Sequence, residues 1–155
     1  MTYYGRGPFE NYIDRYSGAF IGRYEDKVEN QFYWYIRPQE TGNKTDVRWL
    51  TLLDSGGLGV KITGLQPISF SALHFSPEDL DPGLTRKLQH TIDIVPQKNI
   101  FLHVDLKQRG LGGDNSWGMY PHNEYRLLDK KYTYSYMIEL VEKGSDKNDY
   151  LNSRK

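Results

Sequence analysis

The sequence predicts an all-β domain with long loops, and three observations support this class. Aromatic residues are abundant, with 13 Tyr, 6 Phe and 3 Trp among 155 residues. Chain breakers are also frequent, with 15 Gly and 7 Pro. Several short segments alternate apolar and polar residues with the period of two that strands require. At this length the chain fits one domain that is large enough to bury a core.

The first half of the chain contains a hairpin pattern. Residues 5–15 begin with a Gly-Pro break and are predicted to be irregular. Residues 17–25 are predicted to form a strand. Residues 47–53 carry apolar side chains on both alternation faces, and residues 58–63 alternate cleanly. The turn formers at 54–57 lie between these two segments, so the sequence predicts a β-hairpin.

The second half is predicted to contain further strands and one short helix. Residues 68–75 have a strand pattern and are followed by Ser-Pro-Glu-Asp. A capping Ser, a Pro at the first helical position and two acids predict a short helix near 77–82. The other predicted elements are a helical turn at 85–89 and strands at 91–95, 100–107 and 132–141. Residues 142–155 are polar and are predicted to be a disordered tail.

Composition and charge argue against several functional classes. The 20 basic and 20 acidic residues balance, so no overall field favours nucleic acid or an anionic membrane. The chain has no Cys, which excludes disulfides and thiolate chemistry. No apolar run approaches the ~20 residues of a membrane span. The four histidines stand far apart, and neither a metal nor a cofactor is expected in this chain.

A glycine-rich loop at 110–118 is the most distinctive stretch of the sequence. Its turn formers are Asp114, Asn115 and Ser116, and its glycines include Gly112 and Gly113. Near its end, the indole of Trp117 cannot be covered by its sequence neighbours. It either packs back onto the domain as an anchor or points outward as a stacking platform for a ligand. Packing is the commoner role of a large aromatic side chain.

A second polar group lies near the N-terminus, where Glu10, Asp14 and Arg15 fall within six residues. One interpretation is an ion-paired loop that ties the N-terminus down. The other is a polar floor for a sugar site, in which carboxylates accept hydrogen bonds from hydroxyls and Arg donates them. Glu40 and Glu124 are further carboxylates that a glycosidase could use, but sequence alone cannot pair them.

Three motifs resemble the large multidomain bacterial β-galactosidases of glycoside hydrolase family two. Residues 7–15, GPFENYIDR, look like the "GPxExYxDR" stretch of that family. Residues 37–49 are similar to its "PQExGN…DVRW" stretch, and residues 112–118, GGDNSWG, resemble "GGDxSWG". The motifs occur in the same order, and the resemblance covers roughly residues 3–141.

The resemblance implies a fold and a role. The family places this region at the C-terminus of the enzyme, as the later part of an antiparallel β-sandwich related to galactose mutarotases. Its catalytic acid/base and nucleophile, both glutamates, belong to a separate barrel domain whose motifs are missing here. The tryptophan of "GGDxSWG" contacts the sugar, and this role carries over to Trp117. We therefore expect a domain fragment that hydrolyses nothing alone and whose partners are a β-galactoside and the barrel domain.

Other functions stay open at this point. A stand-alone carbohydrate-binding module would bind galactosides by itself. A mutarotase-like epimerase would need a base and an acid, for which His74 or His103 with Glu124 is the candidate pairing. A structural domain would buttress the barrel and shape subunit contacts. The family's front strands would precede Tyr3, so an open apolar face or edge and self-association into a homo-oligomer are expected.

Overall fold

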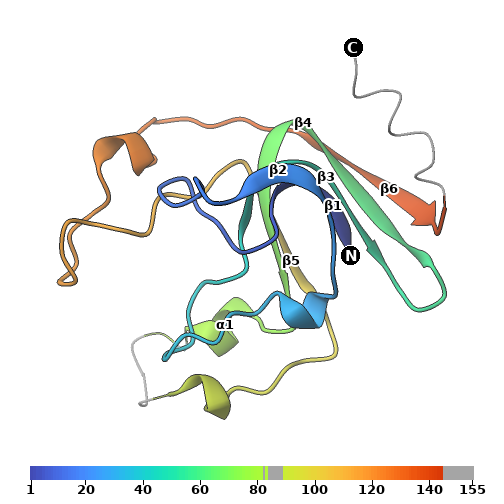
Figure 1. Cartoon of the computed structure of the whole chain (residues 1–155), viewed down its shortest axis with the longest axis horizontal. Coiled ribbons are helices and arrows are strands. Elements are labelled where there is room, and N and C mark those ends of the chain that lie inside the picture. The colour runs from blue at the N-terminus through green and yellow to red at the C-terminus, as the bar shows by residue number, and fades with distance from the viewer. Residues whose placement is uncertain (82, 84–88, 145–155) are drawn as a thin grey trace.

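The chain folds around one antiparallel sheet in a computed structural model that describes residues 1–81, 83 and 89–144. The strands are β1 (Thr2–Gly7), β2 (Phe20–Glu25), β3 (Lys44–Leu53), β4 (Leu58–Leu73), β5 (Phe101–Asp105) and β6 (Tyr136–Glu142). Their order is β2-β1-β3-β4-β5, and β6 pairs with β4 outside this path (Figure 1). The predicted all-β antiparallel class is confirmed. No second sheet packs on the first within the described residues.

β4 is the long central strand of the sheet, and both β5 and β6 pair along it. Its residues 58–64 pair with β6, and its residues 69–73 pair with β5. The predicted hairpin of β3 and β4 is confirmed. The prediction of two separate strands at 58–63 and 68–75 was wrong, because β4 continues through Pro67. The β3 register shifts between Val47 and Trp49, so the proline lies at an irregularity where its missing N–H is tolerated.

β1 was missed in the sequence because its glycines resemble chain breakers. Residues 5–7 belong to this strand, which pairs along its whole length with β2. The strand lies close to β3, since a Cβ on Gly5 would come within 2.6 Å of Cγ2 of Val47. Residues 5–15 are therefore irregular only after β1 ends, at the cis Gly7–Pro8 bond.

The predicted short helix is present as α1 (Pro77–Leu80). Ser76 Oγ accepts the N–H of Asp79 at 3.2 Å, and the Asp79 carboxylate accepts the N–H of Ser76 at 2.8 Å. The strand predicted at 91–95 was wrong, because residues 91–93 form a 3-10 helix, η3 (Thr91–Asp93). The Asp93 carboxylate accepts the N–H of His90 at 2.7 Å and so favours a helical turn over extension. The helical turn predicted at 85–89 lies, except for residue 89, outside the described residues.

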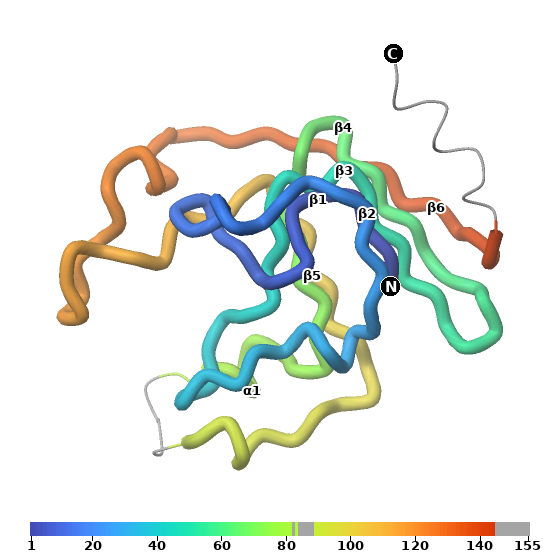
Figure 2. The backbone as a smooth tube through the Cα atoms, in the orientation of Figure 1, coloured from blue at the N-terminus to red at the C-terminus, as the bar shows by residue number. Residues whose placement is uncertain are grey.

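Two buried clusters hold the fold together. The first packs on the sheet and consists of Tyr3, Val28, Val47, Leu50, Ile62, Ile68, Phe70 and Ala72. The second lies beside α1 and consists of Phe32, Leu73, Phe75, Leu80 and Ile94. Figure 2 shows the α1 and η3 segments gathered below the sheet. The part of the chain that the structure describes holds no helix long and apolar enough to cross a membrane.

The remaining predicted strands are present with shifted ends. The strand predicted at 100–107 is β5, and the strand predicted at 132–141 is β6. β6 starts four residues later than predicted, since residues 131–135 have no regular secondary structure. Of the predicted polar tail, residues 145–155 lie outside the described residues.

Candidate functional site

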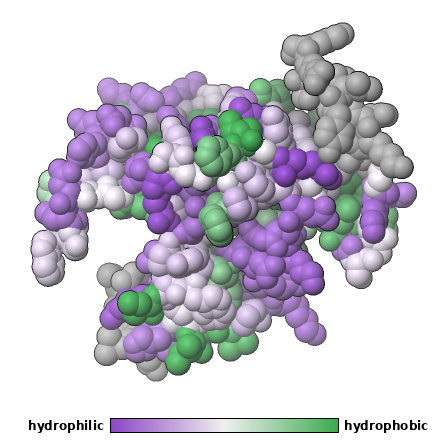
Figure 3. Space-filling view, viewed as in Figure 1, coloured by the Kyte–Doolittle hydropathy of each residue, from purple (hydrophilic) through white to green (hydrophobic). Residues whose placement is uncertain are grey.

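The glycine-rich loop lies on a long segment between β5 and the 3-10 helix η4 (Asn123–Tyr125). We call residues 106–122 the arm. The arm extends away from the sheet, as the orange trace on the left of Figure 1 shows. In Figure 3 it stands clear of the body, with a hollow between it and the part that carries α1. Trp117 is 91% exposed on the arm, so its indole is not packed inside the domain.

The base of the arm is held by the N-terminal segment. The N–H of Gly112 donates to Oδ2 of Asp14 at 2.7 Å. The N–H of Gly110 donates to the carbonyl of Tyr125 at 2.7 Å. A Cβ on Gly110 would lie 2.8 Å from Cγ of Asp14 and 2.9 Å from Cβ of Tyr125, so only glycine fits this crossing without a shift. Asp14 therefore supports the arm.

The outer part of the arm is braced by its own polar side chains. Oδ1 of Asn115 accepts the N–H of Trp117 at 2.8 Å, which is the local turn expected from the sequence. Oδ1 of Asp114 lies 2.7 Å from Nε2 of His122 across the loop. The hydrogen bond and the charge of Asp114 raise the pKa of His122. Ser116 is exposed.

The close approach of the two sides of the arm depends on Gly113. A Cβ at this position would lie 2.2 Å from the carbonyl oxygen of Met119. Gly118 has φ +94°, a conformation that side chains disfavour. The loop is therefore a closed, cross-braced structure that carries one large exposed aromatic ring.

Glu10 and Arg15 form the ion pair that one interpretation of the sequence predicted. Oε1 of Glu10 also accepts from the Tyr35 hydroxyl. Oε2 accepts from Thr41 Oγ1 at 2.9 Å and from the N–H of Gly42 at 2.8 Å. Burial favours the protonated form, but these hydrogen bonds and Arg15 outweigh it and lower the pKa of Glu10. Both carboxylate oxygens are thus engaged within the chain.

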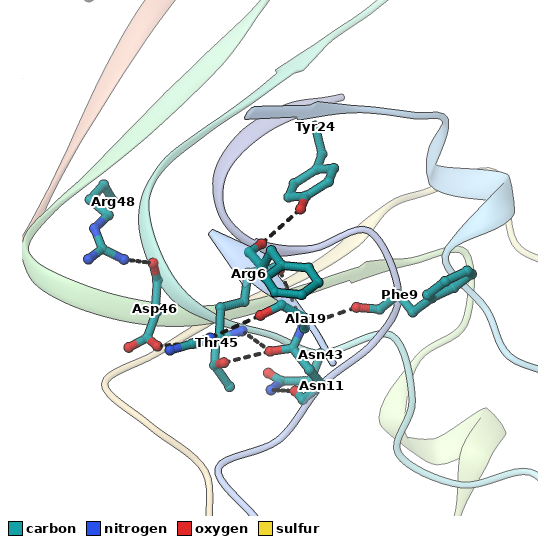
Figure 4. A network of polar contacts seen from close by, with 10 residues as sticks. Arg6, Phe9, Asn11, Ala19, Tyr24, Asn43, Thr45, Asp46 and Arg48 are labelled. Atoms are coloured by element: carbon teal, nitrogen blue, oxygen red, sulfur yellow. Dashed lines mark hydrogen bonds and ion pairs between the residues drawn. The ribbon is translucent and has the colours of Figure 1, made fainter. Parts of the chain in front are cut away.

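A network around Asn11 joins the N-terminal segment to β3 (Figure 4). Its Nδ2 donates to the carbonyls of Phe9 at 3.0 Å and Arg6 at 3.2 Å. Its Oδ1 accepts from the N–H of Thr45 at 3.0 Å and from the Thr45 hydroxyl at 2.5 Å. Asn43 Nδ2 donates to the carbonyl of Asn11 at 2.8 Å. The segment that ends at Asp14 is therefore fixed to the sheet.

Comparison with known proteins gives the chain a family. Residues 1–138 match the family described as beta galactosidase small chain. The chain belongs to this family. It is 39% identical over 140 residues to a beta-galactosidase of Priestia megaterium. It is 37% identical over 141 residues to one of Streptococcus thermophilus and 34% identical over 128 residues to one of Halalkalibacterium halodurans.

The three β-galactosidases are much longer than this chain. The matches cover 90%, 90% and 82% of this chain but only 13%, 13% and 12% of the respective relatives. The chain thus matches about an eighth of the length of these relatives. The resemblance to this enzyme family that the sequence motifs indicated is confirmed.

The three β-galactosidase motifs meet in the folded domain. The first contains Asn11 and Asp14, the second contains Asn43, and the third contains Gly112. Asn11 and Asn43 are joined by side-chain and backbone hydrogen bonds, and Asp14 is joined to Gly112. Asn11 and Asn43, like Tyr35 and Thr41, were missed as individual residues, although the motifs that contain or flank them were found. The available signal for Asn11, Thr41 and Asn43 was their position inside those motifs, and Tyr35 lies two residues before the second motif.

In the part of the chain that the structure describes, no hydrogen bond joins the other sequence candidates to Trp117, whose N–H is held by Asn115. His74 Nδ1 lies 3.0 Å from the carbonyl of Gln97 and 3.1 Å from that of Asn99, so a neighbouring loop holds this ring. Glu124 lies in η4 at the surface. Burial raises the pKa of the Glu40 carboxyl above its usual range, although Gln108 and His103 act in the opposite direction. Among the described residues, no three His, Asp or Glu side chains are grouped so that they could hold a metal ion.

Proposed function

We propose that this chain is the domain of a larger β-galactosidase that supplies the indole of Trp117 to the sugar pocket. The observation that carries the proposal is the exposed ring on a braced arm. A large aromatic side chain normally contributes by removing its surface from water. Here the ring is 91% exposed, while the contacts around it hold the backbone and leave its faces uncovered. This arrangement suits a surface that a ligand or a partner domain covers.

The indole suits a pyranose ring because the two surfaces are complementary. One face of a galactoside presents apolar C–H groups, and an aromatic ring can cover them. Ligand sites in general combine apolar and aromatic walls with a few polar groups that fix orientation. In this proposal the hydroxyls are bound mainly by groups outside this chain. Asp114, Asn115 and Ser116 shape the loop, while Glu10 and Arg15 serve structural support.

The proposal assigns the bond cleavage to the rest of the polypeptide. Retaining hydrolysis requires two carboxyl groups roughly 5–5.5 Å apart, one as nucleophile and one as acid and base. Within this chain, Glu10 is held by four internal donors, and Asp14 is held by the arm. Because the chain matches only 12–13% of its relatives' length, ample sequence exists elsewhere for these carboxyls. The isolated chain is expected to be inactive.

Substitution of Trp117 in the full-length enzyme tests this function. Losing an aromatic contact of this kind costs about 1–2 kcal/mol, which corresponds to a roughly tenfold change in binding. Trp117→Ala should therefore raise KM about tenfold, with a smaller change in kcat, and Trp117→Phe should recover part of the loss. Trp34→Ala is the matched control, since this second exposed indole is not on the arm and contacts Phe32 of the second buried cluster. Wild-type kinetics for Trp117→Ala would remove the indole from the sugar pocket.

Galactoside binding by the isolated chain is the second candidate function, because the indole is already accessible without a partner. Calorimetric titration of the 155-residue chain with galactose distinguishes the two. A measurable heat that Trp117→Ala abolishes would support a stand-alone binding module. No heat from the isolated chain, together with a raised KM for the same variant in the full-length enzyme, would support the shared pocket.

A further inference from the structure

Asp14 lies where the N-terminal segment meets the base of the arm. Its Oδ2 accepts the N–H of Gly112 at 2.7 Å, across a sequence separation of 98 residues. A carboxylate that accepts a backbone N–H makes a charge-assisted bond, which is stronger than a neutral one. Gly110 packs directly against the same carboxyl group. Asp14 is thus joined to the arm by both a directional bond and a close contact.

The position of Asp14 is itself fixed by the core of the domain. The N–H of Arg15 donates to the carbonyl of Tyr12 at 2.9 Å and closes a turn around Asp14. The side chain of Tyr12 is 0% exposed. Immediately before it, Asn11 is fastened to β3 through Thr45. The carboxylate therefore sits on a rigid support and can set the position of whatever it holds.

Four residues separate Gly112 from Trp117, and the arm between them is cross-braced. The Asn115 side chain holds the N–H of Trp117, and the Asp114–His122 contact joins the two sides of the loop. A shift at Gly112 therefore moves the indole instead of being absorbed by a slack loop. We propose that Asp14 is a positioning residue that holds Gly112 and so fixes where the arm presents Trp117. This inference rests on the proposed function of Trp117.

The position of a stacking group matters because a misplacement of about 1 Å can cost up to 10²-fold in rate. The proposal also differs from a role for Asp14 as a sugar ligand, since Oδ2 holds Gly112 and Oδ1, which has no hydrogen-bond partner in the described part of the chain, is buried. Two measurements separate these roles. The first follows the order of the arm in the isolated chain, and the second follows kinetics in the full-length enzyme.

The first measurement is ¹⁵N relaxation of the Gly112 amide and the Trp117 indole in the isolated 155-residue chain. Asp14→Ala should lower the heteronuclear NOE of both groups, because the arm loses its support. Asp14→Asn keeps an acceptor oxygen and should preserve most of the order. Asp129→Ala, a change at an exposed acid beyond η4, is the matched control and should change neither group. Unchanged relaxation in Asp14→Ala would overturn the positioning role whatever Trp117 does.

The second measurement is a double-mutant cycle on KM in the full-length enzyme. Asp14→Ala should raise KM about tenfold, and Asp14→Asn should recover most of this loss. In a Trp117→Ala background, Asp14→Ala should add nothing, because its effect passes through the indole. An equal, additive loss in that background would show that Asp14 acts directly on the sugar or through stability, and would overturn the proposal. If Trp117→Ala alone had a wild-type KM, the proposed function would fail, while the relaxation data would still decide whether Asp14 holds the arm.

Discussion

Lys44 is a buried cation at the start of β3, close to the segment that supports the site. Its side chain is 2% exposed. Its Nζ donates to Oε1 of Gln31 at 2.9 Å and to the carbonyl of Gly42 at 3.1 Å. Burial lowers the pKa of Lys44 from its ordinary 10.5 to about 8, although the negative charges of Glu10 and Asp26 favour the protonated form. The buried charge is thus a cost to the folded state at neutral pH.

This pKa difference predicts that stability rises with pH in an alkaline window. Between pH 8 and 10.5, the unfolded chain still binds the Lys44 proton while the folded chain has released it. Stability increases with pH wherever the unfolded state binds more protons. The gain is about 2 kcal/mol from pH 7.5 to about pH 9.5, since each pKa unit corresponds to roughly 1.4 kcal/mol. Burial raises the pKa of Tyr3 and Tyr12, which opposes the gain above pH 10.

Urea unfolding of the isolated chain at a series of pH values measures this effect. Lys44→Met keeps much of the side-chain length but carries no proton, so the rise from pH 7.5 to pH 9.5 should disappear. Lys98→Met, at an exposed lysine, should leave the rise in place. A wild-type profile that is flat or falls over this interval would refute the reasoning. A rise that survives in Lys44→Met would assign it to another group.

Two further predictions concern the arm and the sheet edge. The pKa of His122 should lie above its ordinary 6.5 because of the hydrogen bond and charge of Asp114, and Asp114→Asn should lower it. An NMR titration of the imidazole checks this, and equal midpoints in the two proteins would contradict it. The isolated chain should self-associate through β6, where Leu140 is 90% exposed, and Leu140→Lys should shift it toward monomer. Sedimentation velocity checks this, and a wild-type monomer at every concentration would contradict it.

The parts of the fold that sequence predicted correctly are those with local signals. The β3–β4 hairpin was predictable because alternating apolar residues flank a turn. Helix α1 was predictable because Ser76 and Pro77 mark its start chemically. β1 was not, because its glycines at positions 5 and 7 are explained only by the strands that pass close to them. The strand predicted at 91–95 is a 3-10 helix instead. Its apolar pattern suggested a strand, but such a pattern forms a strand only where a neighbouring strand is present to pair with it.

The site shows the same division between local and distant information. The tight turn before Trp117 followed from Asn115, whose side chain acts on neighbouring backbone. The bond from Gly112 to Asp14 could not be predicted, because the two residues are 98 positions apart and no local pattern relates them. Sequence left Glu10 open between an ion pair and a sugar ligand. Its donors Tyr35 and Thr41 come from another segment and became visible only in the folded chain.

The glycines of the arm serve close contact more than flexibility. At Gly110 the missing Cβ makes room for the Asp14 carboxyl, and at Gly113 it makes room for the backbone of Met119. A glycine-rich loop is usually expected to be mobile, because glycine loses much conformational freedom when it is ordered. In this arm the entropy cost of ordering the glycines is offset during folding, by contacts with the N-terminal segment and across the loop. Under the proposed function, a sugar that stacks on Trp117 would meet a preformed surface, so little binding free energy would be spent on ordering the loop.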